Sequence, residues 1–107
     1  MKLINDMKKK INDIEEELIL WRRDIHRHPE LAFEEERTSE LVSEKLKKWG
    51  YQVEKMAGTG VVALLKRENE ISTEKTIAIR ADMDALPLEE KTGVEYSSEI
   101  PGKMHAC

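Results

Sequence analysis

The chain has 107 residues, of which 39% are hydrophobic and 37% charged, with 18 Lys and Arg against 22 Asp and Glu and a net charge of −4. This length allows one small domain with a modest core. The mixed, slightly acidic charge argues against a nucleic-acid partner, and no apolar run approaches the roughly 20 residues that cross a bilayer. The N-terminus shows no apolar signal segment and the single cysteine cannot form an internal disulfide, so we expect a cytoplasmic protein with no membrane partner.

A regular apolar stripe predicts one helix over residues 4–28. Because residues three and four apart share a face, we interpret the segment as an amphipathic helix that lies on a sheet. The same spacing is typical of a coiled-coil seam, so a helical module that binds a partner is an alternative. Pro29 disfavours helical geometry at His28 and predicts the helix end there. The stripe consists of Ile4, Met7, Ile11, Ile14, Leu18, Trp21 and Ile25.

Two histidines, His26 and His28, lie at the end of this helix. Side chains two residues apart on a helix point about 200° apart, so the two imidazoles do not converge on one ion while the helix stays regular. We therefore favour a polar helix end, with the imidazoles close to the last carbonyl groups.

The middle of the chain predicts a second helix and a hairpin. Residues 34–49 carry glutamates in the first turn and lysines in the last, with Gly50 just beyond the end, as helix termini favour. The alternating segment 51–56 and the apolar run 61–65 predict a β-hairpin, the second strand being covered on both faces. Residues 76–81 predict a third strand, short and buried.

Two polar segments separate these elements. Residues 67–75 predict a surface connection between the second and third strands. Residues 88–104 predict a long loop, with a short extended piece at residues 94–96. Loops of such length are usually functional or disordered.

The third predicted strand ends in two aspartates, Asp82 and Asp84, spaced so that both side chains point to one side. Two neighbouring carboxylates need a cation, an arginine or a proton to offset their repulsion. A site at the strand end and a local pair with Arg80 explain the spacing equally well. His105 and Cys107 add an imidazole and a thiol, which are zinc ligands in many proteins, although one His-x-Cys is a weak signal alone.

Four motifs in this order resemble the N-terminal part of an M20-family metallopeptidase. The similarity is to the amidohydrolase branch, which includes N-acyl-amino-acid amidohydrolases, hippurate hydrolases, thermostable carboxypeptidases and auxin-conjugate hydrolases. The motifs extend over nearly the whole chain from about Trp21. They are Ile25-His-Arg-His-Pro-Glu-Leu-Ala-Phe-Glu-Glu35 followed by Arg37-Thr38, then Gly58-Thr-Gly-Val-Val-Ala63, then Ile79-Arg-Ala-Asp-Met-Asp-Ala-Leu-Pro87, and Met104-His-Ala-Cys107.

The resemblance implies an α/β fold. Residues 1–107 would form the N-terminal segment of a three-layer α/β/α catalytic domain, with two helices followed by a three-stranded part of a mixed sheet. The rest of that domain and a lid or dimerisation domain would be absent. It also implies two divalent ions, zinc, manganese or cobalt, hydrolysis of an amide bond in N-acyl amino acids or short peptides, and scope for a homo-oligomer of the intact protein.

The resemblance assigns roles to four residues. Cys107 would be a metal ligand, and Asp82, Asp84 and His105 would support the site without binding metal directly. The general-base glutamate and the other ligands would lie beyond residue 107, so we expect this chain to be a truncated, inactive fragment. A non-enzymatic helical interaction module built on the Ile4–Ile25 stripe is the alternative, and a small metal-binding protein is a weaker one. We also expect poor solubility or oligomerisation, because the third strand would expose an apolar edge.

Overall fold

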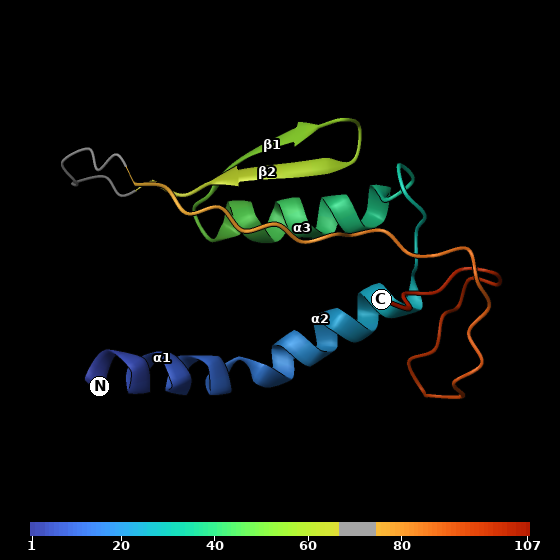
Figure 1. Ribbon diagram of the computed structural model, residues 1–107, viewed down its shortest axis with the longest axis horizontal. Helices are drawn as coiled ribbons and strands as arrows, with labels where there is room; N and C mark the ends of the chain where they lie inside the picture. Colours follow the sequence, from blue (N-terminus) through green and yellow to red (C-terminus); the bar gives the residue numbers. More distant parts are fainter. Residues whose placement is uncertain (67–74) are drawn as a thin grey trace.

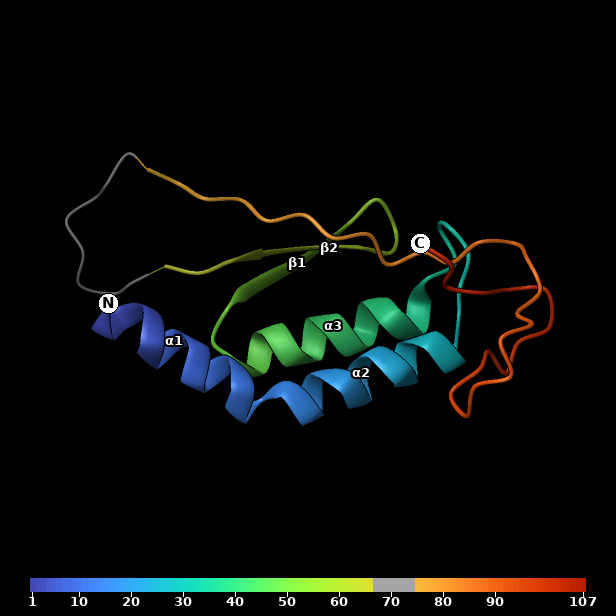
Figure 2. The same cartoon turned by 60° about the horizontal axis from the view of Figure 1, so that its bottom comes forward.

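The computed structural model describes residues 1–66 and 75–107. The predicted connection at residues 67–75 therefore lies, except for its last residue, outside the described part. Three helices are followed by two strands that form a hairpin. The hairpin lies on one side of the third helix, α3, and the second helix, α2, lies on the other side (Figures 1 and 2). No helix in the described ranges is long and apolar enough to cross a membrane. The elements are α1 (Lys2–Asp13), α2 (Glu15–Arg27), α3 (Glu36–Lys48), β1 (Gln52–Met56) and β2 (Gly60–Leu64).

The predicted single helix over residues 4–28 is wrong, because the helix is broken at Ile14 into α1 and α2. Ile14 has φ −108° and ψ 2°, and its amide donates to the carbonyl of Ile11 at 3.2 Å, a tight turn in place of the regular i−4 bond. Helical bonding resumes when Leu18 N donates to the Ile14 carbonyl at 3.0 Å. α2 therefore continues from α1 with a bend (Figure 1).

α3 begins at Glu36, two residues later than predicted, and a carboxylate from outside the helix caps it. Glu30 accepts hydrogen bonds from the amides of Arg37 and Thr38 at 2.9 and 2.7 Å, and from Thr38 Oγ1 at 2.6 Å. These amides are among the four that a helix start leaves without partners. The predicted role of Gly50 is confirmed, since it follows the helix with φ +88°.

The predicted hairpin is confirmed, with β1 and β2 antiparallel and Met56 opposite Gly60 across a three-residue loop. A Cβ added to Gly60 would lie 2.6 Å from the carbonyl oxygen of Met56, so a side chain does not fit there. The prediction that the second strand is covered on both faces is wrong, because Val62 and Leu64 are 48% and 44% exposed.

The predicted third strand is also wrong. Residues 76–81 form no strand, and the side chains of Ile77 and Ile79 are 90% and 93% exposed. The segment is extended and runs back along the hairpin in the direction opposite to β2 (Figures 1 and 2). A strand forms only when its amides and carbonyls pair with those of a neighbouring strand. Within the described residues no strand pairs with residues 76–81. The extended piece predicted at 94–96 is wrong as well, since the chain turns at Glu95 and Tyr96.

Two isolated backbone pairs fix the C-terminal segment to the rest of the molecule. Leu31 pairs with Ala85, whose amide donates to the Glu30 carbonyl at 2.8 Å, and Leu86 pairs with Met104. Ala85 is 3% exposed and is the one buried hydrophobic residue among those described. The buried centre of the fold is therefore small and lies where α2, the start of α3 and the C-terminal segment meet.

Candidate active site

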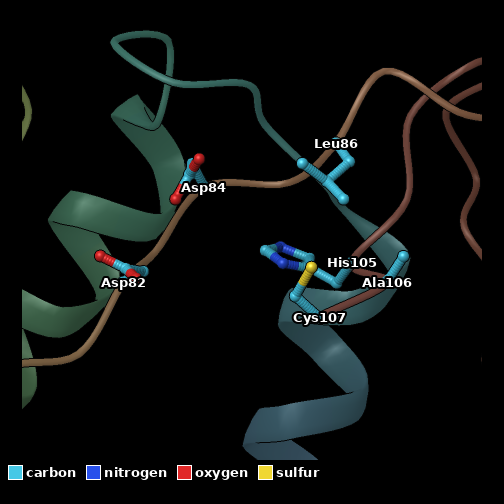
Figure 3. Close-up of a pocket in the computed structure, with 6 residues that line it drawn as sticks. All are labelled: Asp82, Asp84, Leu86, His105, Ala106 and Cys107. Atoms are coloured by element: carbon cyan, nitrogen blue, oxygen red, sulfur yellow. The ribbon is translucent and has the colours of Figure 1, made fainter.

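A hollow of about 420 Å³ lies between the segment that carries the two aspartates and the end of the chain (Figure 3). All four site residues predicted from the sequence line it. Leu86 N and Met104 N each donate to the other residue's carbonyl, at 2.9 and 3.0 Å, and this exchange brings the two segments together. The lining residues are Asp82, Asp84, Leu86, His105, Ala106 and Cys107.

The two carboxylates lie on the side of the hollow opposite His105 and Cys107 (Figure 3). Asp82 Oδ1 lies 2.7 Å from Arg80 Nη2, so the local arginine pair, one of the two explanations of the spacing, does form. Both side chains are mostly exposed, and such pairs contribute little to stability. Asp82 therefore makes a local ion pair with Arg80, and both aspartates line the hollow.

His105 points across the hollow toward the aspartates (Figure 3), and its Nε2 atom is buried without a hydrogen-bond partner among the described residues. Burial lowers the pKa of His105 below its ordinary value, and the nearby His26 adds to this effect. The carboxylates of Asp84 and Glu30 oppose it only in part. The neutral imidazole is thus favoured, with one ring nitrogen free to accept a proton or bind a ligand.

Behind His105 lies a His–carboxylate contact that the sequence analysis did not identify. His26 Nε2 lies 2.7 Å from Glu90 Oε1, and the Glu90 side chain is only 3% exposed. The ring centroids of His26 and His105 are 6.4 Å apart. The sequence predicts a polar helix end for both histidines. His28 confirms this prediction, because its Nδ1 donates to the Asp24 carbonyl at 2.8 Å, whereas His26 contacts Glu90.

Glu90 organises the 88–104 loop. It accepts hydrogen bonds from Thr92 Oγ1 and from the Ser98 amide, the latter at 2.9 Å. These two bonds, with the His26 contact, outweigh the opposing effect of burial and lower the pKa of Glu90 to about 2. No periodic signal marks a glutamate in a polar loop, so only the fold, which brings together residues 64 positions apart, identifies it.

The described residues do not by themselves fit a metal ion. No three His, Cys, Asp or Glu side chains in residues 1–66 and 75–107 lie close enough together to hold one. Cys107 is a free, exposed thiol, and Asp82 is paired with Arg80. A stable structural or catalytic zinc site needs three or four protein ligands.

Comparisons with known proteins show which enzymes the chain resembles. No family model matches the chain. The chain is 45% identical to thermostable carboxypeptidase 1 of Saccharolobus solfataricus, and the match covers 100% of this chain and 27% of that protein. It is 40% identical to the N-acyl-L-amino acid amidohydrolase of Geobacillus stearothermophilus, and the match covers 95% of this chain and 27% of that enzyme.

Among solved structures, the chain resembles the YXEP protein of Bacillus subtilis, described as a dinuclear metal binding peptidase from the M20 family. The TM-score is 0.78 at 38% identity, over 90% of this chain and 26% of that structure. The chain therefore spans about a quarter of the length of the relatives it matches. In sequence and in fold, it therefore resembles about a quarter of an M20-family peptidase and of the related amidohydrolases.

Proposed function

We propose that this chain forms one wall of the active site of a longer, metal-dependent hydrolase that cleaves an amide bond in N-acyl amino acids or short peptides. One observation carries the proposal: Asp82, Asp84, His105 and Cys107 line a single hollow. The names of the relatives, a carboxypeptidase and an N-acyl-L-amino acid amidohydrolase, support the reaction and the substrate class.

Within this wall the four residues have different roles. Cys107 is the metal ligand, since a thiolate binds zinc and similar ions strongly and this thiol is exposed. Asp84 and His105 face the hollow and position the groups around the thiolate. Asp82 supports the site while it is ion-paired with Arg80. The remaining ligands and the general-base carboxylate are supplied from outside residues 1–107, in agreement with the incomplete donor set.

The isolated chain should have no amidase activity. The test is to incubate the purified chain with zinc, manganese or cobalt and with N-acetyl-L-methionine, and to follow release of the amino acid. We expect the rate to equal that of the Cys107→Ala variant. Metal-dependent release that disappears in Cys107→Ala would contradict the proposed incompleteness of the site.

A chimera tests the positive part of the proposal. Residues 1–107 replace the matching segment of the Geobacillus stearothermophilus amidohydrolase, which is 40% identical. We expect metal-dependent hydrolysis, a loss of at least about 100-fold in Cys107→Ala, and a loss of about 10- to 100-fold in Asp84→Asn. Asp6→Asn, on exposed α1 and away from the hollow, is the matched control and should leave the rate unchanged. Equal rates in all four proteins would contradict the proposal.

A non-enzymatic role in binding a helical partner is the second candidate. It is favoured by α1, which carries an apolar stripe and buries no residue. A chimera that lacks activity, together with a specific complex formed through α1, would favour this role over hydrolysis. We place either activity in the cytoplasm, where a lone exposed thiol such as Cys107 stays reduced, and fractionation of cells that produce the protein tests this.

A further inference from the structure

Two polar side chains that the proposed function does not use lie behind the hollow, and both are little exposed to solvent. The Glu90 side chain is 3% exposed and the His26 side chain 13% exposed, and His26 Nε2 lies 2.7 Å from Glu90 Oε1. A carboxylate that is withdrawn from water destabilises the fold unless hydrogen bonds replace its hydration. The bonds that Glu90 makes therefore show what it holds in place.

The two oxygens of Glu90 have different partners. Oε1 faces His26 and accepts from the Ser98 amide at 2.9 Å, while Oε2 accepts from Thr92 Oγ1. The pKa of Glu90, lowered to about 2, keeps the carboxylate ionised at neutral pH, so it can only accept and His26 Nε2 carries the proton of their hydrogen bond. One carboxylate thus fixes both the loop and the direction of the His26 ring.

The His26 ring is also enclosed by other rings. The Tyr96 ring meets it edge-on, with centroids 5.7 Å apart and planes at 77°, and the Arg23 guanidinium lies 4.5 Å from the centre of the Tyr96 ring. On another side lies His105, whose ring centroid is 6.4 Å away, a distance at which aromatic rings pack against each other. His26 therefore forms a fixed surface behind the His105 ring.

His105 has little else to orient it. Its Nε2 atom is buried without a hydrogen-bond partner among the described residues, and the ring points across the hollow toward Asp82 and Asp84 (Figure 3). Within the same residues no hydrogen bond or ion pair joins Glu90 to His105, so Glu90 can act on this ring only through His26 or through the loop.

We propose that Glu90 and His26 are positioning residues, in which Glu90 fixes the His26 ring and His26 in turn holds the His105 imidazole directed at the aspartates across the hollow. The inference rests on the proposed function, because it assigns both residues to the same site. It separates two contributions of Glu90, since Oε1 acts on His26 whereas the Oε2 bond to Thr92 orders only the loop.

Nuclear magnetic resonance of the 107-residue chain tests the contact without any catalysis. We expect a nuclear Overhauser effect between the rings of His26 and His105, which Glu90→Ala should abolish. Glu90→Gln should retain it, because the amide oxygen still accepts from His26 Nε2. Thr92→Val is the matched control, since it removes a loop bond but leaves Oε1 in place, and it should retain the effect as well. A wild-type chain without this effect, or a Glu90→Ala variant that keeps it, would overturn the proposal.

Kinetics of the chimera with the Geobacillus stearothermophilus amidohydrolase test the consequence for the site. Glu90→Ala and His26→Ala should each lower kcat by about 10- to 100-fold and change KM by less than about threefold, because neither residue lines the hollow. His26→Gln should recover most of this loss, since its amide nitrogen can take the place of Nε2 and donate to Glu90. Thr92→Val should lower kcat by less than about threefold.

Two kinetic outcomes would contradict the positioning role. Equal losses in His26→Gln and His26→Ala would show that the donor to Glu90 does not matter, and an equal loss in Thr92→Val and Glu90→Ala would show that Glu90 only orders the loop. A chimera that is inactive with His26 and Glu90 unchanged would count against the proposed hydrolysis. The ring contact in the 107-residue chain would then decide the positioning role by itself.

Discussion

The carboxylate of Glu30 stabilises the start of α3 from the preceding loop. Burial alone would raise the pKa of Glu30, but the hydrogen bonds from Thr38 and Arg37 and the Arg37 charge outweigh it, and the pKa lies below its ordinary value. The ionised form is therefore the one that caps the helix. Asp24 of α2 also binds the start of α3, because Arg37 Nη2 donates to both of its carboxylate oxygens at 2.9 Å.

Glu30→Ala should destabilise the chain by about 1–2 kcal/mol, because the amides of Arg37 and Thr38 lose their acceptor. Urea denaturation measures the free energy of unfolding, and amide exchange at Arg37 and Thr38 should accelerate most. Glu34→Ala is the control, since the Glu34 carboxylate is 60% exposed and should change stability by less than about 0.5 kcal/mol. Equal effects of the two substitutions would refute the capping role.

The 88–104 loop should lose its order in acid. The pKa of Glu90 is lowered from 4.5 to about 2, so the folded loop binds fewer protons than the unfolded one in this range. The stabilisation from Glu90 is present above pH 4.5 and is lost as the pH falls toward 2. Amide exchange at Ser98, which donates to Glu90, measures the change. In Glu90→Gln, which cannot ionise, this part of the pH dependence should disappear, and its persistence would assign the transition to another group.

Some residues of the candidate site can be identified from local sequence motifs, and others only from the folded structure. Asp82, Asp84 and Cys107 belong to short motifs whose residue types already suggest a site. The contact of His26 with Glu90 joins a helix end to a loop, and the capping role of Glu30 depends on a turn at Leu31–Glu34. No local pattern contains such contacts, because they arise only when separate segments pack.

At the scale of the elements, local chemistry predicted the ends of helices and the hairpin. Gly50 follows α3 with the two hydrogen bonds of a complete helix stop, from Gly50 N to the Lys47 carbonyl and from Tyr51 N to the Leu46 carbonyl, both at 3.0 Å. The apolar stripe continues through Ile14 without interruption, so the pattern does not predict the break between α1 and α2. The strand at 76–81 was predicted from composition, but strand formation requires a neighbour that composition does not supply.

Gly60→Ala should disrupt the hairpin, because the new Cβ would lie 2.6 Å from the Met56 carbonyl oxygen and the backbone would have to move. We expect the Met56–Gly60 end of the pairing to open, which loss of cross-strand nuclear Overhauser effects between Lys55 and Val61 would report. Gly58→Ala is the matched control. Gly58 has φ +83° but open space around it, so alanine there should cost about 1–2 kcal/mol of strain without loss of pairing. Retained pairing in Gly60→Ala would contradict the steric argument.

At the scale of the whole molecule, the buried core is small relative to the exposed apolar surface. Ala85 is buried, whereas Val62, Leu64, Ile77 and Ile79 are open to solvent along the hairpin and the extended segment beside it. A protein that exposes many large apolar side chains on neighbouring segments usually covers them with another surface. The chain spans 27% of the length of the relatives that it matches, and we expect that in a protein of their length further residues cover this face.

The double substitution Ile77→Thr/Ile79→Thr should therefore behave differently in two contexts. In the isolated chain both side chains are at least 90% exposed, so unfolding free energy should change by less than about 0.5 kcal/mol, and binding of a hydrophobic dye should fall. In the chimera with the Geobacillus stearothermophilus amidohydrolase, the same substitutions should cost about 2 kcal/mol or more, because each isoleucine would then be buried. Thermal denaturation of the isolated chain and of the chimera measures the loss of stability in each. A large loss in the isolated chain would contradict the exposure of this segment, and no loss in the chimera would show that the additional chain does not cover it.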